Sequence, residues 1–375
     1  MSLFEVYPLY DVTPIKAEDV FVYDNEGNKY LDLYGGHAVI SIGHSHPDYV
    51  AAITSQVEKL GFYSNSIKNP LQSQLADRLA KISGCTDYQL FMCNSGAEAN
   101  ENALKLASFH NGKSKVLAFK NSFHGRTSAA VAATDNSKIV APINAQQIVD
   151  FVELGDLETV EFILKQNETC AVIIECIQGV GGLDQSSTAF YQGLQALCKS
   201  YNTALIADEV QSGFGRTGDF FAFQKHGLKP DIISIAKGMG NGFPVGGILI
   251  HPSIEASFGM LGTTFGGNHL ACAATLSVLD VIAKENLMTN ATYISEYVFE
   301  KARELPKLKS LKGRGLMLGL EFDFPISELR KQLIFKHHIF TGSAKNPNLI
   351  RILPPLTVQK EHIDQLFDAL KIELS

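Results

Sequence analysis

Three apolar segments of strand length constrain the fold of this chain most. They are residues 171–175 (AVIIE), 204–207 (ALIA) and 231–236 (DIISIA). Near-continuous apolar strands that alternate with helical patterns are typical of a parallel sheet covered on both faces. The segments end in or run into the charged residues Glu175, Asp208 and Lys237. Because parallel strands end at the same edge of a sheet, the sequence predicts an α/β fold with these three groups close together.

Lys237 lies at the end of the third segment and is followed by Gly238, Gly240 and Gly242. These glycines can neither continue a strand nor build a stable helix. A lysine kept neutral by burial forms Schiff bases, whereas a lysine whose stem lies over a sheet edge is merely structural. Both interpretations fit Lys237 taken alone. A dinucleotide-binding GxGxxG motif does not fit, because Phe243 replaces its third glycine, and this disfavours a nucleotide-dependent oxidoreductase.

A second strand end, at residues 90–93, runs into the turn Asn94-Ser95-Gly96-Ala97 and then a helix to about residue 110. Ser95 and Glu98 have the spacing of a capping box, which explains an ordinary helix start. The free N–H groups of that helix end can also bind a phosphate, which Gly96 would allow to approach closely. The local pattern leaves both interpretations open.

Phe123, His124 and Arg126 cluster just after a predicted strand at residues 115–119. Ligands gather at such strand ends in open α/β sheets. A core position for Phe123 and a surface ion pair for Arg126 explain the same residues without a ligand.

The two ends of the chain predict a smaller α+β unit. A hairpin is expected over residues 20–33, and the remaining elements are helices at 47–60, 70–82, 190–201, 270–287, 295–305, 326–337 and 362–370 and strands at 315–322 and 349–353. A chain of 375 residues is too long for one typical core. We therefore predict a large domain at 46–277 and a small domain at 278–375, which the N-terminal segment 1–45 joins.

Composition excludes several classes of protein. The net charge is -7 and no basic run occurs, which argues against a nucleic-acid partner. No signal peptide and no membrane-spanning apolar run is present, so we expect a soluble, cytoplasmic protein. The six cysteines include no CxxC pair, which fits reduced, buried thiols. His44 and His46 have no third ligand nearby, so we expect no metal site.

The strand-end groups together match the needs of one cofactor. A phosphorylated pyridine aldehyde requires a lysine amine for its aldehyde and a carboxylate that keeps its ring nitrogen protonated. It also requires an aromatic ring to stack on and a helix N-terminus for its phosphate. Lys237, Asp208, Phe123 and the turn at Ser95 supply this set.

At this point the sequence resembles the class III (ω-amino group) aminotransferases of fold type I, which use pyridoxal 5′-phosphate. The resemblance covers about residues 20–370 and rests on NSGAEANENALKLA, SFHGRT, ADEVQSGFGRTG, IAKGMGNGFPVG and TTFGGN, in the family's order and spacing. It implies a large domain with a mixed, mainly parallel seven-stranded sheet between helices, plus a smaller α+β domain formed from both chain ends.

The resemblance also implies a role for each residue of the cofactor site. Lys237 is expected to form the internal aldimine and then to move the proton, while Asp208 pairs with the ring nitrogen. The other implied contacts are Gln211 at the phenolic oxygen, Val210 and Phe123 on the two ring faces, and Ser95, Gly96 and Ala97 at the phosphate. Thr264 is expected to reach the phosphate of the neighbouring subunit, which implies a homodimer with shared active sites.

Within the family the sequence is most similar to the acetylornithine and succinylornithine aminotransferases. This similarity implies transfer of a terminal amino group between an N-acylated ornithine and 2-oxoglutarate, by a ping-pong mechanism, in arginine biosynthesis. Arg351 is expected to bind the α-carboxylate of glutamate, and Arg126 the distant carboxylate of the second substrate. Glu175 is expected beside the substrate.

Two departures from the family pattern affect the substrate. The chain reads ECIQGV over residues 175–180, and Val180 replaces a glutamate that normally pairs with the glutamate-binding arginine. We therefore expect Arg351 to lack that partner, which favours glutamate. His37 stands where ornithine δ-aminotransferases have a tyrosine; it is either a hydrogen-bonded loop residue or a contact for the N-acyl end. An ornithine, 4-aminobutyrate or lysine ω-aminotransferase and a non-catalytic binding protein of the same fold remain as alternatives.

Overall fold

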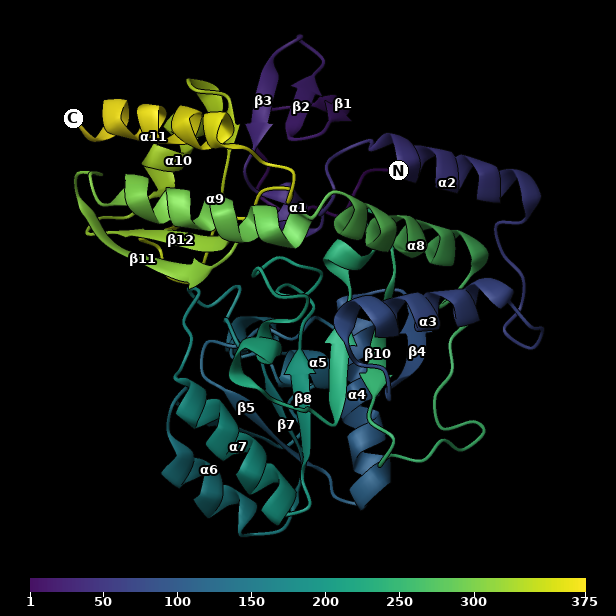
Figure 1. Ribbon diagram of the computed structural model, residues 1–375. Helices are drawn as coiled ribbons and strands as arrows, with labels where there is room; N and C mark the ends of the chain where they lie inside the picture. Colours follow the sequence, from purple (N-terminus) through teal and green to yellow (C-terminus); the bar gives the residue numbers. More distant parts are fainter.

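The computed structural model describes residues 1–375 and is built around one large sheet with helices on both faces (Figure 1). The strands of this sheet are β4 (Gln89–Cys93), β5 (Lys115–Phe119), β6 (Val149–Val152), β7 (Thr169–Ile174), β8 (Ala204–Asp208), β9 (Ile232–Ile235) and β10 (Gly246–Ile250). Their order is β4-β10-β9-β8-β7-β5-β6, and only β10 runs antiparallel to its neighbours. The predicted seven-stranded, mixed and mainly parallel sheet is therefore confirmed.

The central strands are apolar throughout because both faces of the sheet are buried: consecutive side chains point to opposite faces and pack in two different hydrophobic clusters. In β7, Val172 and Ile174 belong to a large hydrophobic cluster, whereas Ala171 and Ile173 belong to a second cluster on the other face. The second cluster contains the apolar side of α4 (Gly96–Asn111), and the large one contains side chains of α6 (Leu157–Leu164) and α7 (Thr188–Ser200). Both faces therefore require apolar residues, which explains the near-continuous runs.

β10 was not predicted, because it opens with Gly246 and Gly247. A Cβ at Gly246 would lie 2.7 Å from the carbonyl oxygen of Ser95, and one at Gly247 would lie 2.7 Å from that of Phe91. Glycine is required there by close backbone approach, and it hides the strand from pattern analysis. The edge strand β6 and the short helix α6 were missed as well.

The chain ends build two smaller sheets. One contains β1 (Pro14–Glu18), β2 (Phe21–Asp24), β3 (Lys29–Asp32) and β13 (Ile339–Phe340), and the other β11 (Leu308–Arg314), β12 (Met317–Phe322), β14 (Gly342–Ser343) and β15 (Leu349–Ile352). The predicted hairpin is confirmed as the antiparallel pair β2-β3. Strand β13 pairs in parallel with β3, so N-terminal and C-terminal segments lie side by side (Figure 1). The domain boundaries at residues 45 and 277 stay a prediction.

The remaining helices are α2 (Pro47–Lys59), α3 (Pro70–Ser83), α5 (Ser128–Ala132), α8 (His269–Lys284), α9 (Leu287–Ala302), α10 (Ser327–Phe335) and α11 (Lys360–Leu374), and α1 (Gly35–Ala38) is a single turn. The sequence placed the start of α9 at Ser295, which is wrong. Asn286 adopts a left-handed φ of 54° that ends the preceding helix, and α9 begins directly after it with the buried Leu287. None of the helices is long and apolar enough to cross a membrane.

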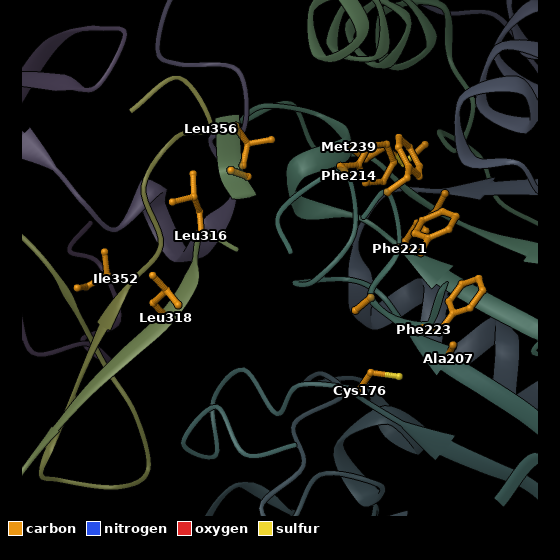
Figure 2. Close-up of a cluster of buried hydrophobic side chains, with 14 of the residues drawn as sticks. Cys176, Ala207, Phe214, Phe221, Phe223, Met239, Leu316, Leu318, Ile352 and Leu356 are labelled. Atoms are coloured by element: carbon orange, nitrogen blue, oxygen red, sulfur yellow. The ribbon is translucent and has the colours of Figure 1, made fainter. Parts of the chain in front are cut away.

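One hydrophobic cluster of 63 buried residues connects the C-terminal strands with the large sheet. Figure 2 shows Leu316, Leu318 and Ile352 on the C-terminal side, and Phe214 and Met239 on the side of the large sheet. This shared core holds the C-terminal unit above the carboxyl edge of β7, β8 and β9.

Candidate active site

The carboxyl ends of β7, β8 and β9 border a cavity of about 360 Å³. Ten predicted site residues line it: Ser95, Gly96, Ala97, Phe123, Arg126, Glu175, Asp208, Val210, Gln211 and Lys237. Three predicted residues, His37, Thr264 and Arg351, are not part of this lining. The structure thus brings most of the predicted set together, although their chemical roles stay predictions.

Lys237 enters the cavity from the turn that follows β9. Its backbone has a left-handed φ of 45°, and its amine has no hydrogen-bond partner in the protein. Burial lowers the pKa of Lys237, and the positive charge of Arg351 acts in the same direction, while Asp208 and Glu175 oppose the shift. A lowered pKa increases the neutral fraction of the amine, which is the nucleophilic form.

Asp208 is buried at the end of β8 and accepts three hydrogen bonds. Its Oδ2 accepts from His124 Nδ1 (2.7 Å) and Asn100 Nδ2 (2.8 Å), and its Oδ1 accepts from the N–H of Val210 (3.0 Å). These donors fix the carboxylate at the wall of the cavity. A fixed carboxylate is what a protonated pyridine nitrogen requires.

His124 and Asn100 were missed as partners of Asp208. His124 directly follows Phe123, and Asn100 lies one helical turn after Gly96, so both positions were visible in the quoted motifs. Their buried Nε2 and Oδ1 atoms have no partner. Only the folded chain reveals that both side chains converge on one carboxylate.

The N-terminus of α4 faces the same cavity. Ser95 caps the helix, since its Oγ accepts a hydrogen bond from the N–H of Glu98 (3.2 Å), as the capping spacing predicts. A Cβ at Gly96 would lie 2.5 Å from Cγ1 of Val210. Only glycine therefore fits, and the free N–H groups of the first turn are left accessible to an anion.

Glu175 is buried and holds two backbone segments rather than a charged partner. Its Oε1 accepts from the N–H of Phe123 (2.9 Å) and its Oε2 from the N–H of Gly179 (2.8 Å). Burial raises the pKa of Glu175, against the effect of these hydrogen bonds. The carboxylate therefore positions Phe123, and its predicted place beside the substrate stays a prediction.

Arg126 is exposed at the rim of the cavity and forms no ion pair. The segment after it is held by Glu101, whose carboxylate accepts from Thr127 Oγ1 (2.8 Å) and from the N–H groups of Ala129 and Ala130 (3.0 Å each). Because Arg126 has no ion-pair partner, its guanidinium is free to bind a ligand. The backbone that follows Arg126 is anchored by Glu101.

Arg351 is buried on β15 and also lacks a carboxylate partner. Its Nε donates to the carbonyl of Ser343 (2.5 Å), its Nη1 to that of Gly179 (2.8 Å) and its Nη2 to the hydroxyl of Tyr34 (3.3 Å). Burial lowers the pKa of Arg351. The neighbouring Val180 contributes an apolar side chain to the cavity lining and no charge.

His37 lies beside Tyr34, whose hydroxyl is 2.5 Å from His37 Nδ1. The side chain reaches solvent, yet neighbouring atoms partly desolvate its ring, and this desolvation together with the charges of Arg351 and Lys237 lowers the pKa of His37. Thr264 is exposed on the loop between β10 and α8. Its expected contact with a neighbouring subunit stays a prediction.

Comparison with known proteins identifies the family. The sequence profile described as "Aminotransferase class-III" matches residues 5–374. The chain belongs to the class III aminotransferases. This class III aminotransferase is 40% identical to the acetylornithine aminotransferase of Aquifex aeolicus, with 98% of each chain covered. It is 38% identical to that of Bacillus subtilis, covering 99% of this chain and 97% of the relative.

Solved structures show the same architecture. An ornithine aminotransferase from Toxoplasma gondii matches with a TM-score of 0.91 at 26% identity, covering 98% of this chain and 91% of the other. A Bacillus anthracis aminotransferase matches with a TM-score of 0.90 at 26% identity, covering 100% and 96%. The predicted fold and enzyme class are therefore confirmed.

The residues present fit pyridoxal phosphate. The cavity offers an unpaired lysine amine, a carboxylate fixed by His124 and Asn100, and a helix end at which only Gly96 fits. Val210 and Phe123 provide apolar surfaces in the same lining. No group of three His, Cys, Asp or Glu side chains is arranged to hold a metal ion.

Proposed function

We propose that this class III aminotransferase moves the terminal amino group between an N2-acylated ornithine, acetyl or succinyl, and 2-oxoglutarate, with pyridoxal phosphate as cofactor. One observation carries the proposal: an amine, a fixed carboxylate and a helix N-terminus meet in one cavity that Arg126 lines and that Arg351 borders through Gln211, and neither arginine has a carboxylate partner. Relatives at 36–40% identity that are named acetylornithine aminotransferases support the substrate. Arginine biosynthesis is the corresponding pathway.

When bound, pyridoxal phosphate supplies an electron sink for the carbanion that forms when the substrate loses its proton. The negative charge of Asp208 keeps the ring nitrogen of the cofactor protonated. His124 and Asn100 hold the Asp208 carboxylate in place. Lys237 Nζ is the base that takes the proton from the substrate carbon bearing the amino group. The first turn of α4 and Ser95 hold the phosphate.

The two arginines select the substrates. Arg351 is buried, and its hydrogen bonds fix the orientation of the guanidinium. It therefore suits the α-carboxylate, which glutamate and 2-oxoglutarate both carry next to the reacting carbon. Arg126 is exposed at the rim and suits the carboxylate at the far end of the N-acylated ornithine. Alternating occupation of one cavity corresponds to a ping-pong mechanism.

We also propose a cytoplasmic homodimer in which Thr264 contacts the phosphate bound to the partner subunit. The exposed loop that carries Thr264 supports this, because Phe265 is 59% exposed and lies next to Phe62, which is 42% exposed. Adjacent exposed aromatic side chains are typical of a protein interface.

Absorbance spectroscopy and kinetics test the proposal. We expect the purified protein to show an absorbance band near the visible edge that borohydride abolishes by reducing the lysine adduct. A panel of amino donors at fixed 2-oxoglutarate should then rank N-acetylornithine or N-succinylornithine first. A colourless protein after reconstitution, or a Lys237→Ala variant that still transfers amino groups, would contradict the mechanism.

An ornithine aminotransferase is the second candidate, because the structural relatives include enzymes with that name. Unacylated ornithine as the best donor in the panel would favour it. The contact between His37 and the N-acyl group is tested with N-acetyl- and N-succinylornithine. His37→Ala should reduce kcat/KM unequally for the two substrates, and an equal loss would contradict that contact.

A further inference from the structure

Arg351 carries a buried positive charge that only neutral groups contact. Two of its four acceptors are backbone carbonyls, those of Ser343 and Gly179. The other two are the side-chain oxygen of Gln211 (3.5 Å) and the hydroxyl of Tyr34, and the ring of Tyr34 lies 5.7 Å from the guanidinium carbon. Neutral acceptors orient a guanidinium without cancelling its charge, so the charge remains available to a bound carboxylate.

Tyr34 opens an unusual backbone segment. All four residues of α1 have positive φ, namely Gly35 (53°), Gly36 (54°), His37 (71°) and Ala38 (62°). The N–H of Ala38 donates to the carbonyl of Tyr34 (3.0 Å), so this segment is one turn of left-handed helix. L-residues with side chains avoid this region, and such conformations cluster where a ligand is held.

The turn is anchored on both sides, which keeps Tyr34 in place. The carboxylate of Asp32 accepts hydrogen bonds from the N–H groups of Tyr34 (3.0 Å) and Gly35 (2.8 Å). The ring of Tyr34 packs on Gly342, where a Cβ would lie 2.4 Å from Cε2 of the tyrosine. A side chain at Gly342 would displace the ring from Arg351.

The chemistry of the donors and acceptors limits how the hydrogen bonds between Arg351, Tyr34 and His37 can be oriented. A guanidinium can only donate, so the Tyr34 oxygen accepts from Arg351 Nη2. The same hydroxyl lies within hydrogen-bond distance of His37 Nδ1, and it can donate to this nitrogen when the imidazole is neutral with its proton on Nε2. The hydrogen-bond chain from Arg351 through Tyr34 to His37 contains no carboxylate.

We propose that Tyr34 is a specificity-determining positioning residue, which holds Arg351 through this hydrogen-bond chain so that its uncompensated charge selects substrates with a carboxylate beside the reacting carbon. The inference rests on the proposed function and deepens it, since it assigns the substrate class at Arg351 to short dicarboxylates. The left-handed turn is required because it brings His37 back to the hydroxyl of Tyr34.

Calorimetric binding of glutarate to the reconstituted enzyme tests this inference without turnover. Glutarate has the carboxylates of 2-oxoglutarate but no group that reacts with an amine. Tyr34→Phe keeps the ring and removes the hydroxyl, and we expect glutarate affinity to fall about ten-fold. The matched control is Tyr88→Phe, which removes a hydroxyl bonded to the carbonyl of Pro230 (2.6 Å) outside the cavity. Its glutarate affinity should equal that of the wild type.

His37→Gly is a second variant, which tests the inference even if Tyr34→Phe fails to fold. Glycine adopts a φ of 71° freely, so this change removes the imidazole without backbone strain. We expect glutarate affinity to fall about three-fold, in the same direction as for Tyr34→Phe. For Tyr34→Phe, KM for 2-oxoglutarate should rise while KM for N-acetylornithine stays unchanged.

The outcomes separate the inference from the proposed function. Wild-type affinity for glutarate in both variants would overturn the role of Tyr34 and leave the proposed function intact. A wild-type enzyme that does not bind glutarate would overturn both, because no dicarboxylate site would then exist. An equal rise of KM for both substrates would assign Tyr34 a structural role and also overturn the inference.

Discussion

The floor and the rim of the active-site cavity are built in different ways. The floor consists of Lys237, Asp208 and the N-terminus of α4, which lie at strand ends and a helix start of one large sheet. We call rim the exposed Arg126 together with Arg351 and the turn at His37, which lie beside the cavity lining; they come from a loop, from β15 and from the N-terminal segment. The large sheet and its helix α4 thus position the floor, whereas the rim depends on contacts between segments from different parts of the chain.

This difference predicts how the two regions affect catalysis. Groups on the floor act on chemistry that every amino donor shares, so their loss should reduce all activities alike. Groups on the rim contact only the distinguishing ends of the substrates, so their loss should affect one half-reaction. Substitutions ordered by expected effect test this separation.

The largest effect is expected for Lys237→Ala. Loss of the amine removes both the nucleophile and the base, and initial rates should fall more than about 10⁴-fold with every donor. Lys229→Ala, an exposed lysine before the same strand, is the control and should retain full activity. Substantial turnover by Lys237→Ala with any donor would break the distinction between floor and rim.

Asp208→Asn should rank second. The amide keeps the shape but removes the charge that faces the cavity, and kcat should fall about 10²–10³-fold for all donors. Asp231→Asn changes a carboxylate at the opposite end of β9, where it accepts from the N–H of Leu205 (2.8 Å), and should have little effect. A loss confined to one donor would show that Asp208 belongs to the specificity rim.

Arg351→Lys and Arg126→Lys should each affect one substrate. A lysine lacks the planar fork that binds a carboxylate through two hydrogen bonds. Arg351→Lys should raise KM for 2-oxoglutarate about 10–100-fold, because the site is buried, and Arg126→Lys should raise KM for N-acetylornithine less. Steady-state kinetics with both substrates varied measures this, and identical patterns for both variants would contradict separate roles.

A smaller effect is expected for Val180→Glu. The new carboxylate would lie next to Gly179, whose carbonyl already accepts from Arg351, and could neutralise that arginine. We expect KM for glutamate to rise and the half-reaction with amines that lack an adjacent carboxylate to speed up, each by about ten-fold or less. Single-turnover measurements of both half-reactions decide this, and unchanged rates would exclude a role for position 180.

The smallest effect concerns stability rather than catalysis. Gly36→Ala places a side chain at a φ of 54°, where no atom lies within 4 Å of the new Cβ, so only backbone strain opposes it. The free energy of unfolding should fall by about 1–2 kcal/mol. Gly262→Ala, which also meets no atom within 4 Å and has no left-handed φ, should leave the denaturation midpoint unchanged.

Much of the floor was predictable because its signals are local. Apolar runs that end in a charged residue specify β7, β8 and the turn to Lys237, and the Ser95 and Glu98 spacing specifies the start of α4. Errors occurred where glycine or a short element hides the period, as in β10, or where Asn286 ends a helix without a proline. These errors did not move the strand ends that carry the chemistry.

Local sequence patterns specify the parallel strands whose ends carry the chemistry, and contiguous motifs identify the family, because both kinds of signal are encoded over a few residues. The environment of Arg351 is set by the packing of distant segments. Tyr34 and Arg351 lie 317 residues apart, and their contact depends on the parallel pairing of β13 with β3 and on the left-handed turn after Tyr34. No local pattern encodes such a contact, since it arises when the two chain ends pack together above the sheet.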